Sequence, residues 1–237
     1  MDVHAPHGPL HTWRDFWIHL GTITIGLLIA ISLEQSVAGL LHVHQRHQLE
    51  QDLRAEGERN VEIVQKDQRM IAALRDWELD LRKNVDTMRE SGGKAGLGYV
   101  ANPVPGQPTV PSDSVWTTAK ESVLVALLPR AEAEMYSRLD LQHGLLRETI
   151  SHWLAVKGEL KEFEDNFDDA EPGSTPDLSR MSTEDLHSYA MLLTKEIAAR
   201  DNALFRLNNF LRLDRAVLDG AQTEAEMIEK AQLPELR

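Results

Sequence analysis

Residues 16–41 read FWIHLGTITIGLLIAISLEQSVAGLL, an apolar run that contains no lysine or arginine and one carboxylate, Glu34. A helix rises about 1.5 Å per residue, so about 20 apolar residues cross a hydrocarbon core about 30 Å thick. Residues 16–33 carry no Asp, Glu, Lys or Arg, and residues 36–41 extend the apolar pattern past Glu34 and Gln35. The run therefore predicts one transmembrane helix at 16–41, preceded by a short N-terminal tail at 1–15.

The start of the chain argues against a cleaved signal peptide. Such a peptide has a positive start, an apolar core of about 7–15 residues and a small-residue cleavage site. Here Arg14 is offset by Asp2 and Asp15, and the weak small-residue site at 36–38 comes after Glu34. We expect a retained anchor. Its orientation is a separate matter: Arg46 and two further arginines follow the run, and this count favours a cytoplasmic C-terminal domain.

The composition excludes several classes of site. A net charge of −13 argues against a nucleic-acid surface, which needs clustered lysine and arginine. The absence of cysteine excludes disulfides, thiolate zinc sites and a cysteine nucleophile. No Ser-His-Asp, HExxH or GxSxG arrangement is recognisable in the sequence, so we expect no enzyme and no cofactor.

The helical pattern continues beyond the anchor. Alternating steps of four and three from Leu53 define a seam that is apolar at Leu53, Val64, Ile71, Leu74, Leu81, Val85 and Met88. Four small or polar residues interrupt it, namely Gly57, Asn60, Asp67 and Glu78. No proline occurs between Pro9 and Pro103, so one unbroken helix from 13 to 89 is allowed. We predict a stalk helix at 42–90, continuous with the transmembrane helix.

The rest of the chain predicts further helices after an irregular connection. Residues 91–113 hold five glycines and four prolines and form the predicted loop. Amphipathic helices are expected at 114–128, at 129–167, from a capping box at Ser182 to residue 218, and, after Gly220, at 223–231. The buried face of the last long helix is interrupted only by Arg200 and Asp214.

These elements indicate an all-α fold. We expect an N-terminal transmembrane helix continuous with a long stalk helix, followed by an antiparallel helical bundle at 114–237. The distal part of the stalk helix completes the bundle. Its tryptophans, Trp77, Trp116 and Trp153, are expected to be core or rim residues. The acidic residues near 162–171 are interpreted as a solvated patch and not as a calcium site.

A stripe of mostly small side chains crosses the apolar run at four-residue spacing: Thr22, Gly26, Ala30, Glu34 and Ala38. Small residues let transmembrane helices approach closely, so this stripe is a candidate contact with another helix. Glu34 has three interpretations. It can reach the headgroup region or Gln35 of a partner helix near the end of the span, it can act as a proton- or ion-coupling group, or it can make another contact between helices.

Aromatic and imidazole side chains flank the run. We expect Trp13, Phe16, Trp17, His42 and His44 to be interfacial anchors, because amphipathic rings are favoured at the headgroup level. His44 and His47 also share a helix face and are weak candidates for metal ligands. We predict no metal site.

The anchor block resembles a family of uncharacterised bacterial single-pass inner-membrane proteins. The shared residues are Trp13, Asp15, Phe16 and His19, then GLLIAI at 26–31, and Leu33-Glu34-Gln35. A second block, SVWTTAKESVLVALLPRAEAEMYSRL at 114–139, is similar to that group as well, although some relatives carry glycine in place of Val123. The resemblance implies a cytoplasmic N-terminus and a helical periplasmic domain. It implies no activity.

From these features we expect a membrane-anchored helical scaffold or interaction protein. Its partners would be the lipid bilayer and either a second copy of the chain or another membrane protein, with no nucleic acid. Self-association would use the anchor stripe and the stalk seam. The alternative is a ligand-sensing or stator-like accessory subunit, in which the bundle is a receptor and Glu34 couples ions.

Overall fold

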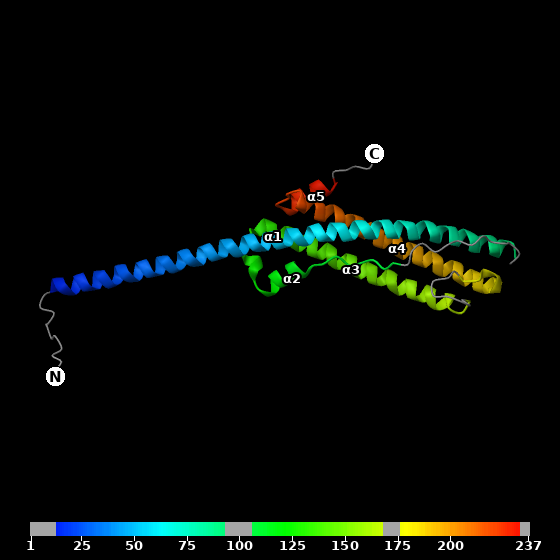
Figure 1. Cartoon of the computed structure of the whole chain (residues 1–237), viewed down its shortest axis with the longest axis horizontal. Coiled ribbons are helices and arrows are strands. Elements are labelled where there is room, and N and C mark those ends of the chain that lie inside the picture. The colour runs from blue at the N-terminus through cyan, green and yellow to red at the C-terminus, as the bar shows by residue number, and fades with distance from the viewer. Residues whose placement is uncertain (1–12, 93–105, 168–175, 233–237) are drawn as a thin grey trace, which may run out of the picture. The chain divides into compact units, whose positions relative to one another are not determined.

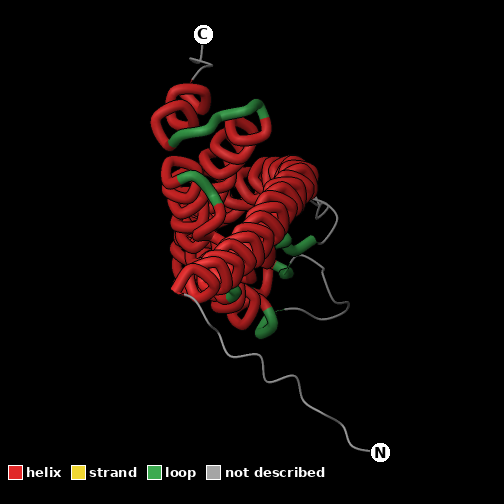
Figure 2. Tube along the Cα trace, turned by 90° about the vertical axis from the view of Figure 1, so that its left-hand side faces the viewer, coloured by secondary structure: helices red, strands yellow, loops and turns green. Residues whose placement is uncertain are grey.

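The computed structural model describes residues 13–92, 106–167 and 176–232 of the chain. The regular structure within these residues is helical (Figures 1 and 2). The elements are α1 (Trp13–Glu90), α2 (Ser114–Glu121), η1 (Leu124–Leu127), α3 (Arg130–Glu164), η2 (Leu178–Arg180), α4 (Thr183–Leu218) and α5 (Glu224–Gln232). The predicted all-α fold, with a long N-terminal helix and a helical bundle, is confirmed.

The chain forms two units, Met1–Gln48 and Leu49–Arg237. The first contains the apolar N-terminal part of α1, and the second, which we call the bundle unit, contains the rest of α1 and all the other helices. The bounds of α1 agree with the sequence prediction to within one residue. Asp15 in its first turn and Arg89 in its last turn complement the helix dipole.

The core of the bundle unit is built by α1, α3 and α4. Figure 1 shows α3 and α4 alongside the C-terminal part of α1. At the centre, Val64 and Ile71 of α1 pack in one cluster with Ile150 and Trp153 of α3 and Leu207 of α4. These side chains are at most 1% exposed. Burying an aliphatic side chain of this kind stabilises the folded chain by about 1.5–3 kcal/mol.

Two further clusters extend the core along the helices. One joins Leu49 and Leu53 of α1 to α2, the start of α3, the end of α4 and α5. The other joins Leu81, Val85 and Met88 of α1 to the end of α3 and the start of α4. Because burial begins at Leu49, nearly the whole stalk helix takes part in the core.

The helix termini follow local chemistry. Ser182 and Asp185 form a reciprocal capping box at the start of α4, as predicted. Gly220, just beyond α4, has φ of +84°, a left-handed conformation that glycine adopts without strain.

The predicted helix at 114–128 is wrong in one respect. It is interrupted after α2, and Val123 has φ of +62° before η1 begins. A β-branched residue is unfavourable in this left-handed region, because its side chain crowds the following carbonyl. The helical spacing of the apolar residues gave no sign of this break.

We predict that Val123→Gly stabilises the protein by about 0.5–1 kcal/mol. Glycine removes the left-handed strain, and part of this gain is offset by its greater freedom in the unfolded chain. Little packing is lost, because Val123 is 70% exposed. Chemical denaturation of the full chain in detergent measures the change. Val123→Ala is the control: it keeps a Cβ atom and should gain less. A loss of stability in the glycine variant would contradict the claim that the backbone at Val123 is strained.

Candidate functional site

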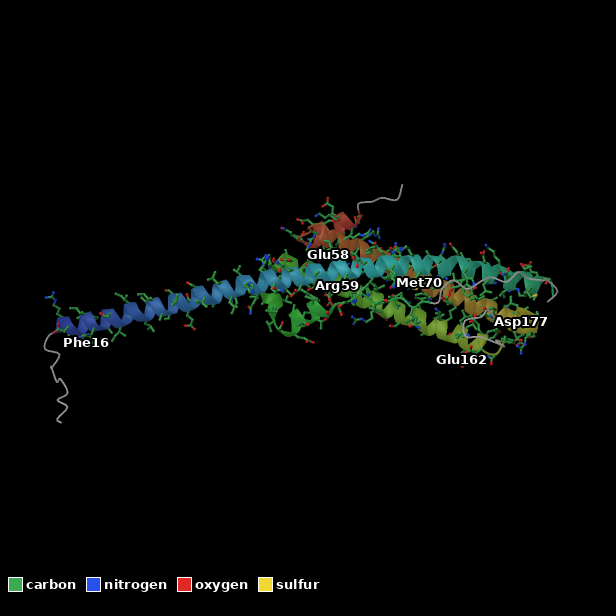
Figure 3. All side chains as sticks on the ribbon, viewed as in Figure 1. Phe16, Glu58, Arg59, Met70, Glu162 and Asp177 are labelled. Carbon is green, nitrogen blue, oxygen red and sulfur yellow. The ribbon has the colours of Figure 1, made fainter. Side chains whose placement is uncertain are left out.

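The N-terminal part of α1 is covered with exposed apolar side chains. Its large hydrophobic residues from Trp13 to Val43 are all at least 41% exposed. Side chains stand on every side of this part of the helix, as seen near Phe16 (Figure 3). Among the described residues, α1 is the one helix that is long and apolar enough to cross a membrane, judged by its length and composition.

The hydroxyl groups of this segment bond to its own backbone. Thr22 and Thr24 donate to the carbonyls of Ile18 and Leu20 at 2.9 and 2.8 Å. Ser32 and Ser36 donate to carbonyls four residues earlier, each at 2.7 Å. Such bonds satisfy polar hydroxyls without water or a partner, which is a requirement in lipid.

The predicted stripe lies wholly on exposed positions of α1: Thr22, Gly26, Ala30, Glu34 and Ala38. A Cβ atom added at Gly26 would meet no other atom within 4 Å. Within the described residues of the first unit, the stripe is therefore exposed and available for contact. Whether it contacts another helix remains a prediction.

The residues predicted as interfacial anchors include a compact aromatic group. Trp13 lies 5.4 Å from Phe16 and 5.8 Å from Trp17 between ring centroids. His42 and His44 are exposed. Within the described residues no group of three or more His, Asp or Glu side chains is arranged to hold a metal ion, so His44 and His47 have no third ligand there.

A second candidate site lies in the bundle unit, where side chains of α1 bind the main chain of residues 106–113. We call this segment the strap. Asp67 Oδ2 accepts a hydrogen bond from the Thr109 N–H at 2.7 Å. Asn60 makes two bonds of 2.8 Å to Ser112, in which Oδ1 accepts from the N–H and Nδ2 donates to the carbonyl. These side chains satisfy strap groups that a neighbouring strand would satisfy in a sheet.

The spacing of these bonds fits the geometry of both segments. Asn60 and Asp67 are seven residues apart, which is about 10.5 Å along a helix. Their partners, Ser112 and Thr109, are three residues apart, or about 10 Å in an extended chain. The strap therefore runs antiparallel to α1 in a register set by two residues that interrupt the predicted seam.

Glu56 continues the series at the start of α2. Its Oε1 accepts from the hydroxyls of Ser112 and Ser114 at 2.6 and 2.8 Å and from the Val115 N–H at 3.2 Å. Asp113 is the N-cap residue of α2 but makes no side-chain cap bond. Glu56 thus takes the capping role from another helix, and a carboxylate there complements the helix dipole.

The strap is bound on its other side by α3. The buried ring of His143 places Nε2 2.5 Å from the Pro111 carbonyl oxygen, and since a carbonyl only accepts, Nε2 donates. Arg147 Nη2 donates to Asp113 Oδ2 at 2.6 Å. Burial acts to raise the pKa of Asp113, but the Arg147 hydrogen bond and the nearby His143 lower it overall. By contrast, burial raises the pKa of Asp67 despite its bond from Thr109.

We predict that Asn60→Leu destabilises the protein by about 1–3 kcal/mol, because the N–H and carbonyl of Ser112 both lose their partner. If position 60 served only as part of the apolar seam, the leucine would instead be expected to stabilise the folded protein. Chemical denaturation of the full chain in detergent distinguishes the two. The matched control is Glu62→Leu at an exposed position of α1, which should change stability little. A more stable Asn60 variant would contradict the role of this residue.

A buried ion pair connects α1 to α4. Arg200 is fully buried and contacts the Glu78 carboxylate directly, and Asp201 Oδ1 lies 3.5 Å from its Nη2. Glu196 is also buried, and its Oε1 accepts from Trp153 Nε1 at 2.6 Å. Burial lowers the pKa of Arg200 and raises that of Glu196. Two residues that interrupt the apolar faces of their helices, Glu78 and Arg200, are therefore each other's partners.

We predict that Arg200→Met costs about 3–5 kcal/mol, because it leaves Glu78 buried without its cation. Adding Glu78→Met should recover a large part of this loss, since both charges are then gone. A double-mutant cycle by denaturation measures the coupling. As a control, Arg75→Met removes a half-exposed ion pair to Asp201 and should cost less than about 1 kcal/mol. Additive effects of the two core substitutions would contradict the pairing.

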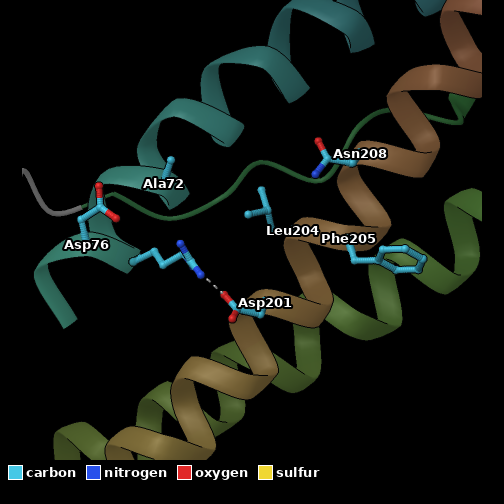
Figure 4. Close-up of a pocket in the computed structure, with 7 residues that line it drawn as sticks. Ala72, Asp76, Asp201, Leu204, Phe205 and Asn208 are labelled. Atoms are coloured by element: carbon cyan, nitrogen blue, oxygen red, sulfur yellow. Dashed lines mark ion pairs between the residues drawn. The ribbon is translucent and has the colours of Figure 1, made fainter. Parts of the chain in front are cut away.

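An open depression of ≈ 360 Å³ lies between α1 and α4 (Figure 4). Its lining consists of Ala72, Arg75 and Asp76 from α1 and Asp201, Leu204, Phe205 and Asn208 from α4. Arg75 Nε and Asp201 Oδ1 are paired across it at 3.5 Å. This pair leaves Asp76 as the remaining charged side chain of the lining.

The sequence reading missed the strap and the partners of its polar residues. The sequence does contain a signal for them, because four residues interrupt the apolar seam of α1 and two interrupt the buried face of α4. Comparison of the chain with protein-family models, with curated proteins and with solved structures finds no match.

Proposed function

We propose that the protein is a single-pass membrane protein whose helical bundle serves as a scaffold or interaction domain. The observation that carries this proposal is the contrast within α1. Its apolar side chains are exposed on all sides before Leu49, whereas from Leu49 onward one face is buried in the bundle core. An exposed apolar helix of this length is stable in a lipid bilayer and costly in water.

Two local features support a lipid environment for residues 16–41. The four hydroxyl groups bond internally, so they carry no unsatisfied polar group into the hydrocarbon. The aromatic group of Trp13, Phe16 and Trp17 stands at the start of the apolar run, where amphipathic rings favour the interface.

The proposal includes self-association through the stripe of Thr22, Gly26, Ala30, Glu34 and Ala38. Close approach at small residues is the main route by which helices pack in lipid. The stalk seam supports no such contact between chains, because Val64, Ile71 and Val85 are already buried within one chain. The anchor stripe is therefore the surface that we assign to a second copy.

We further propose the bacterial inner membrane as the location, with the bundle in the periplasm. The resemblance of the anchor block supports this orientation, although the arginines that follow the run favour the reverse. A phosphatase fused after Arg237 and active only outside the cytoplasm distinguishes them: activity supports the periplasmic bundle, and inactivity overturns it.

The second candidate is a ligand-sensing or stator-like subunit. The depression between α1 and α4 favours it, since a receptor needs a site on its bundle. We rank it second because two of the three charged side chains of that depression, Arg75 and Asp201, pair with each other.

The test of the leading proposal uses the full chain expressed in bacteria. We expect it to stay in the membrane fraction after alkaline carbonate extraction and to form oligomers in mild detergent. Gly26→Leu should reduce the oligomer at least tenfold, because the larger side chain separates the helices.

Gly21→Leu is the matched control. Gly21 is equally open but lies about 140° around the helix from Gly26, so this variant should associate like the unmodified protein. Release by carbonate would overturn the anchor. Equal effects of the two substitutions, or a monomer throughout, would overturn the association surface while leaving the anchor intact.

A further inference from the structure

Asp214 is a buried carboxyl group placed against α1. Its side chain is 2% exposed, and Oδ2 has no hydrogen-bond partner within the described part of the chain. A Cβ atom added at Gly57 would lie 3.1 Å from Asp214 Oδ1. Gly57 therefore faces the Asp214 side chain directly, and a larger residue there would require that side chain to shift by a few tenths of an ångström.

The residue before Gly57 brings a second carboxylate to the same place. Glu56 is 5% exposed, and its Oε1 is the acceptor for Ser112, Ser114 and Val115 described above. One carboxyl group thus belongs to α4, and the other belongs to α1 and holds the strap and the start of α2. Two negative charges buried together are strongly unfavourable unless a proton or a cation neutralises one of them.

Other charged groups of this region act on Tyr136 of α3. Burial raises the pKa of that phenol, Glu132, Asp214 and Glu50 raise it further, and Arg54 opposes them. Lys230 of α5 donates to the Asp219 carbonyl at 2.8 Å, beyond the end of α4. Glu56 is the charged residue that acts on Asp214 itself.

We propose that Asp214 and Glu56 form a proton-operated latch that controls the closure of α4 against α1 and, through Glu56, the hold on the strap and on the start of α2. With the proton on Asp214, the carboxyl group is neutral and stays buried against Gly57. When the proton leaves, the ionised carboxylate is more stable in water than in the buried site, so it moves away from Glu56. The end of α4 then separates locally from α1.

The pH range of the latch follows from its surroundings. Burial, and then the charge of Glu56, raise the pKa of Asp214 to about 7. In the open state the group is hydrated and its pKa is near 3.9. The closed state therefore binds more protons, and closure weakens as the pH rises between these values. From pH 6 to pH 8 the closed-to-open ratio should fall about tenfold.

Hydrogen exchange of the full chain in detergent, followed by mass spectrometry at pH 6 and pH 8, tests the latch. After correction for the intrinsic exchange rate, we expect protection at 114–121 and 211–219 to fall about tenfold from pH 6 to pH 8. Asp214→Asn should abolish this fall and keep the protection high at pH 8. Asp219→Asn changes an exposed carboxylate just beyond the end of the same helix; it is the matched control and should behave like the unmodified protein.

Constant protection in the unmodified protein, or a fall that persists in Asp214→Asn, overturns the proposal. If that variant does not fold, Glu56→Gln decides, because it removes the neighbouring charge and leaves Asp214 in place. The fall in protection between pH 6 and pH 8 should then be smaller, because the pKa of Asp214 is lower without that charge, and an unchanged fall overturns the coupling. The measurement concerns the bundle unit alone, so its result does not depend on the proposed membrane location.

Discussion

The need to satisfy polar groups inside an apolar seam shapes the bundle unit more than any other constraint. A buried polar side chain without a partner costs more than an ordinary hydrogen bond contributes, so each one requires a complementary group at a defined place. Three buried residues of α1 impose this requirement at three positions along the helix: Asn60, Asp67 and Glu78. The strap supplies the partners of Asn60 and Asp67, and Arg200 is the partner of Glu78.

This requirement makes the arrangement specific. An entirely apolar seam would let three long helices slide past one another, since hydrophobic burial is not directional. The pairing of Glu78 with Arg200 sets the position of α4 along α1, and the Asn60 bonds set the position of the strap. The apolar clusters supply most of the stabilisation, while the polar residues select which of several similar packings is formed.

Sequence periodicity was sufficient for the long elements. The bounds of α1, the capping box at Ser182 and the end of α4 near Gly220 follow from local chemistry within a few residues, and local chemistry is visible in a sequence. The strap was not predictable, because it depends on bonds between residues about fifty positions apart, such as Asn60 and Ser112. The break at Val123 was concealed by a residue type that rarely adopts its conformation.

The sequence predicts the two parts of α1 unequally well. The apolar run indicated its own environment by composition, so its exposure in the structure agrees with what was expected of it. The seam beyond Leu49 correctly predicts which face of α1 is buried, but it does not predict the partners of that face. The residues that determine its partners are the three polar ones that interrupt the apolar pattern, Asn60, Asp67 and Glu78.

The matched spacing of α1 and the strap has a consequence for how this chain can change length. Seven helical residues of α1 stand opposite three residues of the strap. Inserting or deleting one residue between Asn60 and Asp67 would rotate one of them off the strap by about 100°. Length changes on the two segments are therefore tolerable only in paired steps of seven and three. Among natural variants of such a chain, this stretch should resist insertions and deletions far more than an ordinary loop beside a helix.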